Sequence, residues 1–541
     1  MKTFDPIHRA RCNQHSFSSD KEYRSILSSA RKDLRAYDAE VARLQNAIDF
    51  LESEKASLKG YVLVCGSLEA PARRLPREIL LHIFQYIQPQ VWIQCGSVGA
   101  TLMPPAMGLA SVSHYWRDIV SSAPQLWANV LLDVLDYSKD THSQVMPWLE
   151  GIVLRAKAVP LTLELDVRAQ AISHSPEEAQ ILFSYLRNLM SRTRNIHCGW
   201  VFADIVPSSS MACLESVALL ATNITSPSDT WTRINLSQLA PNLSKLHIHA
   251  QSSFPVFNHA KITELKISMV PVSLVAPALD SCTALRTLEM GPLFDEGQDF
   301  RPIEIVLPAL SNLVIADNGS SLPDRAVNIS RILSMLTLPR LSKLCVKDAE
   351  PLSLLPPPSH FSKLADLIAR SRCDVVHFSC FGSQSLGISS LISFLSSQTP
   401  SLQSLSVGYP EKNAAPGGLD PLLEFLSHGQ PSSGIHATHH LPQIYTLQIT
   451  APRKSFDDHK FVDLVKSRWR PQDMDFYAHA GATTVSCIQS IDLVVKKGKF
   501  SDELWEPLRR RQMHGLRVSV RDKRGCVRTR WEQSQREDES S

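Results

Sequence analysis

The chain has 541 residues, of which 43% are hydrophobic and 20% charged, and its formal net charge is +3. This composition is ordinary for a globular protein, and so small a net charge gives no support for a nucleic acid or a membrane as a partner. No apolar run approaches the roughly 18 residues of a membrane-spanning helix. The eleven cysteines are scattered, without a C-x-x-C pair, so we expect reduced thiols and a cytoplasmic or nuclear location.

The N-terminal part of the chain predicts a long helix. We expect residues 1–19 to be disordered and residues 20–60 to form a coiled-coil-like helix, because apolar residues recur seven apart in two series. Two roles fit such a helix: association with another chain, or packing against its own protein. We expect weak homodimerisation through residues 27–58, with Tyr37 and Lys55 as imperfections in the seam. The two series are Leu27, Leu34, Val41 and Ile48 in the a positions, and Tyr37, Leu44, Leu51 and Leu58 in the d positions.

Two amphipathic blocks follow, within residues 75–127. The first reads Leu-Pro-Arg-Glu-Ile-Leu from Leu75, and Pro76 suits the first turn of a helix, where its missing N–H removes no hydrogen bond. Apolar residues then recur on one helical face, and the block at residues 109–120 repeats this pattern. Short helices cannot bury so much apolar surface among themselves, so we expect a partner to cover part of it. An ordinary helical hairpin inside a larger core is the alternative.

The ordered set Leu-Pro-x-Glu-Ile-Leu, Ile-Phe, Val-Ser, Trp-Arg and Leu-Trp resembles the F-box, a short helical module. The preceding long helix resembles a layout common among fungal F-box proteins. The resemblance implies an F-box module over residues 71–130, in which residues 88–108, rich in proline and glycine, form a loop insertion. It also implies docking on a Skp-type adaptor and, through it, on a cullin. The residues implied to form or support this contact are Leu75, Pro76, Ile79, Leu80, Ile83, Phe84, Ile87, Val112, Trp116 and Leu126.

After residue 150 the pattern L-x-x-L-x-L recurs, with other aliphatic residues in some leucine positions. Its last two apolar positions are two residues apart, which is the alternation of a strand. The first six copies start 29, 19, 23, 25 and 31 residues apart, and spacings in the twenties are typical of leucine-rich repeats. The copies are Leu214–Leu219, Leu243–Ile248, Ile262–Ile267, Leu285–Met290, Leu310–Ile315, Leu341–Val346, Leu402–Val407, Ile444–Ile449 and Ile488–Leu493, with a weaker one at Val375–Cys380.

Helix candidates lie between these strands, and Ser175-Pro176-Glu177-Glu178 has the pattern of a capping box. Alternation of strand and helix predicts parallel strands, because the connections are too long for hairpins. The predicted fold class is therefore α/β: a long N-terminal helix and a small all-α F-box module, followed by a leucine-rich-repeat-like solenoid with parallel strands over residues 150–520. Residues 521–541 are almost wholly polar and are predicted to be a disordered tail. A helical solenoid of the HEAT or armadillo type is the rival architecture.

The sequence contains no nucleotide-binding glycine loop and no G-x-S-x-G nucleophile elbow. His436, His439 and His440 cluster, but no further metal ligand lies at a telling spacing, so we interpret them as a solvated loop. The stretch 496–530 is rich in lysine and arginine, and it fits either a solvated helix face or a patch for nuclear import or an acidic partner. We expect no catalytic residues, no cofactor and no metal.

The F-box resemblance implies a protein that catalyses no reaction itself and serves as the substrate-recognition subunit of an SCF-type cullin–RING ubiquitin ligase. An unknown protein substrate would meet outward-facing strand positions of the repeats. These positions mix both charge signs with neutral groups, so they do not identify a class of substrate. The alternative is a leucine-rich-repeat scaffold whose F-box-like helices are only a structural cap. The candidate substrate-binding residues are Lys245, His247, Glu264, Lys266, Glu289, Lys343, Thr446 and Gln448.

Overall fold

The computed structural model divides the chain into two compact units, Met1–Tyr86 and Ile87–Ser541. The predicted disordered N-terminus, residues 1–19, lies outside the described residues. The structure describes residues 20–69, 71–87, 90–96, 99–168, 175–199, 201–220, 234–249, 256–294, 303–317, 324–348, 360–382, 388–398, 401–409, 415–427, 441, 443–469, 488–496, 505–513, 515–522 and 525–527.

The described part of the first unit is helical. It contains α2 (Asp20–Glu69), the short 3-10 helix η1 (Pro71–Arg74) and α3 (Arg77–Ile87). The predicted long N-terminal helix is confirmed, but it does not end at residue 60. Each exposed glycine costs a helix only about 1 kcal/mol, so α2 continues through Gly60 and Gly66. It ends just before Pro71, a residue type that interrupts helices.

A sheet of 17 described strands forms the second unit. Strand pairing follows chain order from β3 to β21, with β1 and then β2 on the outer side of β3. All pairs are parallel except the outermost ones at the two ends, β1–β2 and β20–β21. The structure therefore confirms a mixed α/β fold with a large, mostly parallel sheet. A wholly helical architecture is wrong for the part of the chain that is described.

The strands of this sheet are short, as parallel strands joined by crossovers usually are. Two small parallel pairs accompany it: β9 (Val270–Pro271) with β11 (Leu293–Phe294), and β12 (Ile305–Val306) with β14 (Leu336–Thr337). The main strands are β1 (Gln90–Gly96), β2 (Gly99–Met103), β3 (Asn129–Val134), β4 (Leu161–Val167), β5 (Thr193–Cys198), β6 (Ser216–Leu220), β7 (Lys245–His249), β8 (Glu264–Ser268), β10 (Thr287–Met290), β13 (Asn312–Asp317), β15 (Lys343–Asp348), β16 (His377–Phe381), β17 (Ser404–Gly408), β18 (Thr446–Pro452), β19 (Ser490–Lys496), β20 (Arg517–Asp522) and β21 (Gly525–Val527).

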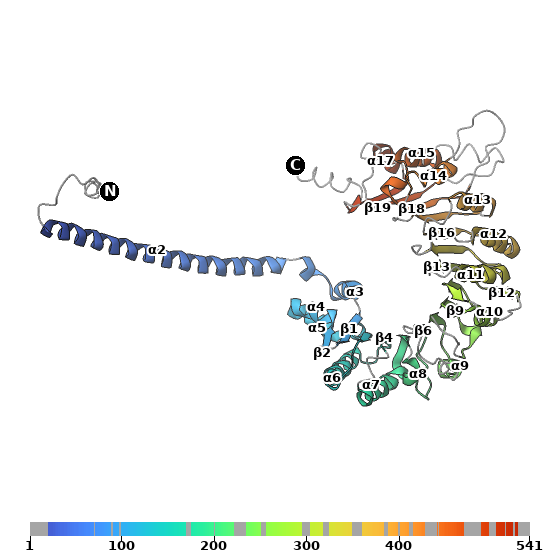
Figure 1. Ribbon diagram of the computed structural model, residues 1–541, viewed down its shortest axis with the longest axis horizontal. Coiled ribbons are helices and arrows are strands. Elements are labelled where there is room, and N and C mark those ends of the chain that lie inside the picture. The colour runs from blue at the N-terminus through green and yellow to red at the C-terminus, as the bar shows by residue number, and fades with distance from the viewer. Residues whose placement is uncertain are drawn as a thin grey trace. The chain divides into compact units, whose positions relative to one another are not determined.

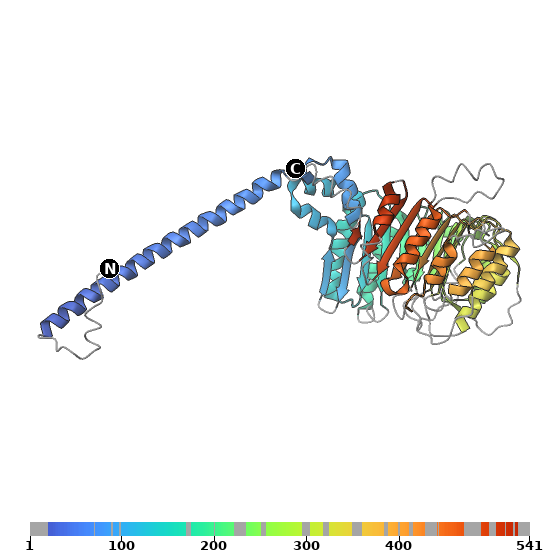
Figure 2. The same ribbon diagram turned by 90° about the horizontal axis from the view of Figure 1, so that it is seen from above.

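Helices cover one face of the curved sheet. Within the second unit, the helices from α6 to α17 lie along the convex side, and the strands line the concave side (Figures 1 and 2). The helices of this unit are α4 (Pro105–Val112), α5 (His114–Ser122), α6 (Lys139–Ala156), α7 (Pro176–Leu189), α8 (Phe202–Ile205), α9 (Leu236–Leu239), α10 (Val272–Asp280), α11 (Asp324–Met335), α12 (His360–Ser371), α13 (Ile388–Gln398), α14 (Asp420–Leu426), α15 (Asp458–Arg468) and α17 (Trp505–Met513).

The repeated apolar pattern forms the core between sheet and helices. Every copy contributes a strand to the main sheet, and the middle leucines of neighbouring copies are directly paired in register, as Leu265 is with Leu288 and Leu288 with Leu313. Strand alternation sends these side chains to the helix-covered face. Their predicted burial is confirmed: at most 1% of the residue is exposed at Leu246, Leu265, Leu288, Leu313, Leu344 and Leu405.

The prediction of a loop insertion at residues 88–108 is wrong. Strands β1 and β2 form an antiparallel hairpin there, and β1 also pairs in parallel with β3. Val91, Ile93 and Cys95 are fully buried and alternate with more exposed residues, which is the pattern of a half-buried strand. The predicted all-α module of residues 71–130 therefore contains strands, and its helices fall into different units.

The predicted limits of the repeat region also need correction. Three strands, β1 to β3, precede residue 150, so the sheet begins at Gln90. At the other end Arg521 and Asp522 belong to β20, and residues 525–527 form β21 antiparallel to it. The predicted disordered tail therefore does not start at residue 521, because a hairpin extends the ladder of backbone hydrogen bonds beyond the last parallel strand. Residues 528–541 lie outside the described part.

Arg468 shows how successive turns of the second unit are joined. It ends α15 and is 3% exposed, and it donates hydrogen bonds to the carbonyl oxygens of Leu426 (Nε, 2.7 Å) and Leu441 (Nη1, 3.0 Å). Burial lowers the pKa of Arg468 to about 10. The guanidinium thus satisfies two backbone acceptors, one at the last residue of α14 and one beyond it.

We expect Arg468→Leu to destabilise the fold by about 2–3 kcal/mol, because buried carbonyl groups would lose their donors. Urea unfolding followed by circular dichroism would measure the loss. Lys466→Leu, on the exposed side of the same helix where Lys466 pairs with Asp463 at 3.1 Å, is the matched control and should change stability by less than about 0.5 kcal/mol. Equal unfolding midpoints for the two variants would contradict this role of Arg468.

Candidate functional site

The most unusual surface of the first unit is an apolar stripe on α3. Ile79, Ile83, Tyr86 and Ile87 are 46%, 38%, 89% and 55% exposed, and their spacing places them on one helical face. We call these four residues the α3 apolar face. Pro76 precedes the helix, and its carbonyl accepts the first helical hydrogen bond, from the Leu80 N–H at 3.1 Å. A stripe of large apolar side chains left in solvent marks an interaction site.

The remaining predicted adaptor-binding residues divide by burial. Leu80 and Phe84 are almost completely buried on the flank of this stripe, so they support the helix and cannot contact a partner directly. Leu75 is partly exposed and Pro76 is exposed. An adaptor face requires Ile79, Ile83 and Phe84 to be exposed, whereas a structural cap would bury them. The answer within α3 is divided, because Ile79 and Ile83 are exposed and Phe84 is buried.

In the second unit, α4 and α5 present Val112 and part of Trp116. Val112 is 60% exposed, and Leu126, the third predicted contact of this unit, is buried. Ser113 caps α5 by accepting a hydrogen bond from the Trp116 N–H at 3.2 Å, which explains the turn between the two helices. Trp127 is buried and donates to the carbonyl of Val120 at 3.1 Å. The Leu-Trp pair of the motif is therefore part of the core.

The eight predicted substrate-binding residues all lie on the concave face of the sheet. They belong to two rows of paired residues, which we call the concave rows, and their strand neighbours on the other face are buried. Lys245 and Lys343 are exposed as predicted, and Lys266 is partly exposed. The first row contains Lys245, Glu264, Thr287, Asn312, Lys343, His377, Ser404 and Thr446; the second contains His247, Lys266, Glu289, Val314, Cys345, Ser379, Ser406, Gln448 and Asp492.

Ion pairs connect the charged members of the concave rows. Lys245 pairs with Glu264 at 3.2 Å, and Glu289 lies between Lys266 at 3.2 Å and Lys347 at 3.7 Å. These side chains remain 25% to 57% exposed, so each pair contributes little to stability, typically below about 1 kcal/mol. A ligand that offers its own charges can therefore exchange partners with them at low cost.

A second polar chain crosses the last strands of the concave face. Ser406 donates to Gln448 at 3.1 Å, Gln448 donates to Asp492 at 3.3 Å, and Arg521 pairs with Asp492 at 2.5 Å. Asp492, Arg521 and the Lys347 of the preceding cluster were not singled out by the sequence. Asp492 lies inside the copy Ile488–Leu493, so continuing the alternation of that motif would have identified it.

His247 is the most perturbed titratable group on the concave face. The pKa of His247 is lowered to about 4, mainly by burial and further by the positive charge of Lys266 and the neighbouring His249, while Glu289 opposes the shift. The imidazole therefore stays neutral well below the pH at which a free histidine becomes charged. It offers a neutral donor and acceptor between the two ion-pair clusters.

We expect His247 to make the protein less stable as the pH falls from 6.5 to 4. The unfolded chain, with a histidine pKa of 6.5, binds a proton in this range more readily than the folded chain does, so protonation favours unfolding. The folded protein therefore keeps its full stability above pH 6.5 and loses part of it as the pH falls towards 4. Because His247 is partly exposed, the effect should be on the order of 1–2 kcal/mol. Between pH 6.5 and pH 4 the melting temperature of the wild type should therefore fall more steeply than that of His247→Gln. Parallel profiles would contradict the assignment.

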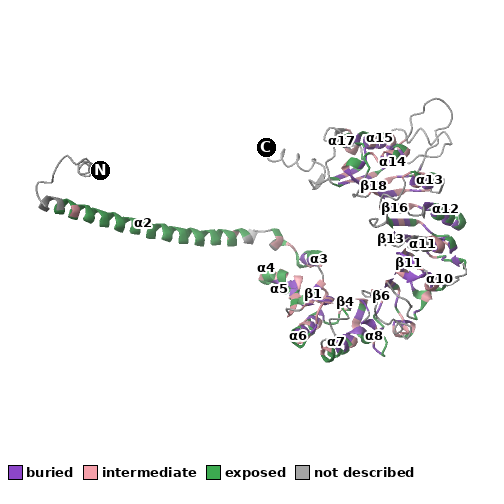
Figure 3. Cartoon of the chain, in the orientation of Figure 1, coloured by how far each residue is buried: buried purple, intermediate pink, exposed green. Residues whose placement is uncertain are grey.

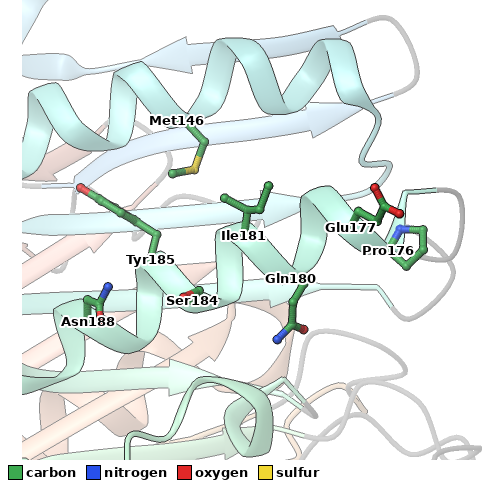
Figure 4. Close-up of a pocket in the computed structure, with 8 residues that line it drawn as sticks. All are labelled: Met146, Pro176, Glu177, Gln180, Ile181, Ser184, Tyr185 and Asn188. Carbon is green, nitrogen blue, oxygen red and sulfur yellow. The ribbon is translucent and has the colours of Figure 1, made fainter.

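A shallow groove of about 880 Å³ lies on the convex side, between α6 and α7. Figure 4 shows Ile181 and Tyr185 on α7 directed towards Met146 on α6, with Glu177 at one end of the groove. Ile181 is 54% exposed because α7 buries a different stripe, which includes Leu182, Phe183 and Leu186.

The capping box predicted at the start of α7 is not formed, since the Ser175 side chain makes no cap hydrogen bond.

The described residues offer no arrangement suited to metal chemistry. No group of three or more histidine, cysteine or acidic residues could hold a metal ion among them, and the cluster of His436, His439 and His440 lies outside the described part. None of the described helices is both long enough and apolar enough to cross a membrane.

Comparison with known proteins adds no relative. No protein-family model matches the chain, and no curated protein matches it significantly. The resemblance to the F-box therefore rests on the motif residues between 75 and 127, and the function has to be inferred from the two surfaces described above: the α3 apolar face and the concave rows.

Proposed function

We propose that this protein is a non-catalytic substrate-recognition subunit of an SCF-type ubiquitin ligase. In this proposal the F-box-like helices dock on a Skp-type adaptor, which is carried by a cullin, and the concave rows hold a protein substrate. The ligase gains rate by proximity, because a substrate held near the ubiquitin-loaded enzyme reacts in an effectively intramolecular step.

The α3 apolar face is the observation that carries the proposal. Its four apolar side chains are 38% to 89% exposed in the described chain, although burying them would be favourable by about 25 cal/mol for each Å² of apolar surface. They occupy the helix that begins with the Leu-Pro-x-Glu-Ile-Leu motif.

The repeats support a leucine-rich-repeat-like solenoid as the substrate-binding part. Ten copies of one apolar pattern pair in register, each strand beside the next copy in the chain, as stacked repeats do. The helix-free concave face exposes charged and polar side chains from many strands. Such a face suits a protein ligand, because neighbouring strands supply contacts at a regular spacing of about 4.8 Å.

Direct binding tests the proposal. Isothermal titration of the purified full chain with a purified Skp-type adaptor is expected to show a one-to-one complex. The alternative function, a scaffold with the same helices as a structural cap, is favoured by the burial of Leu80 and Phe84 and predicts no binding at all. Absence of heat and of co-elution at micromolar concentration would reject the ligase proposal and leave the scaffold.

A further inference from the structure

The helix α2 is covered by nothing in the described chain. Along residues 24–66 nearly every side chain is exposed (Figure 3). An apolar stripe of this length is unusual on the surface of a monomer, and a long helix gains most of its stability from packing. The apolar residues Leu34, Val41, Leu44, Ile48, Leu51 and Leu58 are 48% to 65% exposed.

These residues belong to a heptad repeat that extends beyond Gly60. Continuing the a series from Ile48 leads to Lys55 and Val62, and continuing the d series from Leu58 leads to Cys65, which is also helical and partly exposed. A repeat of 3.5 residues produces a seam that stays on one side of the helix only if two helices wind around each other with a left-handed twist. The geometry of α2 therefore suits a partner helix with the same repeat.

We propose that α2 forms a parallel, in-register, two-stranded coiled coil with the α2 helix of a second copy of this chain. Over the central heptads the a positions hold β-branched residues, Val41, Ile48 and Val62, and the d positions hold Leu44, Leu51 and Leu58. This distribution favours two parallel strands over higher oligomers. Lys55 is the only charged residue at an a position between Leu27 and Val62, and a single lysine there selects register and oligomeric state at a cost in stability.

The flanking charges favour the same orientation. In a parallel pair Glu54 at a g position faces Lys59 at the next e position of the partner helix, although Asp33 then faces Asp38. The antiparallel register that stacks Leu34 on Leu58 and Val41 on Leu51 would instead place Glu40 against Glu54 and Asp38 against Glu52, with no compensating pair of opposite charge. The parallel dimer retains one attractive contact on each side, so we expect it to be weak and specific.

Two copies joined in this way would present two α3 apolar faces and two sets of concave rows. A partner with two sites, or a substrate with two binding segments, would then be bound with an avidity that neither copy has alone. The dimer itself does not depend on the function proposed above, because α2 contains none of the adaptor-binding residues.

Multi-angle light scattering of the full chain is expected to show a mass that rises with concentration from 60.3 kDa towards twice that value. Leu44→Lys with Leu51→Lys should keep it at the monomer mass and leave adaptor binding unchanged. Phe50→Lys is the matched control, since Phe50 is 65% exposed but lies at a c position outside the seam, and this variant should still dimerise. A wild type that stays monomeric at micromolar concentration, or equal loss in both variants, would overturn the proposal.

Orientation can be tested with Cys65. In the parallel dimer the two Cys65 thiols face each other at a d position, and diamide should oxidise them to one disulfide while it takes up their two electrons and two protons. The antiparallel register would hold them about 57 Å apart at 1.5 Å per residue. Cys213 is also exposed, so only a cross-link that disappears in Cys65→Ser supports the parallel dimer. A dimer that gives no such cross-link would overturn its orientation.

Discussion

Replacing Ile83 with aspartate is expected to abolish binding of a Skp-type adaptor while the rest of the chain stays folded. Ile83 lies in the centre of the α3 apolar face and is 38% exposed, so the substitution disturbs little within the chain itself. In the complex the new carboxylate would be buried without a partner, which costs about 2–4 kcal/mol or more. The dissociation constant should rise by about 30-fold to 700-fold, and isothermal titration would measure it.

Gln85→Glu is the matched control for this substitution. It adds the same negative charge to the same helix, with almost no change in shape, on a different side from the apolar stripe. Its affinity for the adaptor should stay close to that of the wild type. Leu75→Ala combined with Pro76→Ala is a second variant, expected to weaken binding without adding charge. Co-purification of the adaptor with Ile83→Asp at the wild-type level would refute the assignment of this face.

Leu288→Ala is expected to lower the stability of the second unit by about 2–5 kcal/mol, because the substitution leaves a cavity in a closely packed core. Leu288 is completely buried and is paired in register with Leu265 and Leu313 on the neighbouring strands. In a repeat array each turn is stabilised mainly by its neighbours. Hydrogen exchange of the backbone amides should therefore accelerate first in β8, β10 and β13, before the effect spreads along the sheet.

Thr287→Ala provides the comparison for the core variant. Thr287 is the preceding residue on β10 but belongs to the concave rows and is partly exposed, so its truncation should cost less than about 1 kcal/mol. Urea unfolding of both variants would separate the two positions. If the two substitutions lowered the unfolding midpoint equally, the division of β10 into a buried face and a concave face would be wrong.

The sequence alone was sufficient to predict the repeated strands. Each copy of L-x-x-L-x-L has a two-residue alternation that only a strand can place on one face, and every copy is a strand of the main sheet. The same argument predicted the burial of Leu288 and the exposure of Lys245. These features are local, because they depend on the period of the pattern and not on which strand lies next to it.

The hairpin of β1 and β2 could not be predicted in the same way. Glycine and proline at its ends suggested a loop, and its short apolar alternation became a strand only because β3 offers an edge for β1 to join. The same holds for β21, which is formed by residues from a polar stretch that pair with the last parallel strand. In both places the free hydrogen-bonding edge of the sheet overrode a weak local preference.

In the candidate surfaces, too, the sequence determined some features and the tertiary structure decided others. Helical periodicity identified the apolar residues of α3, but it assigned Ile83 and Phe84 to one broad stripe, and only packing decided that Ile83 faces solvent and Phe84 does not. On the concave face the sequence supplied the outward positions, whereas strand register decided that Glu289 lies between Lys266 and Lys347. Residues 58 positions apart in the chain become neighbours only when parallel strands stack, because lateral pairing is a property of the folded sheet and not of any single segment.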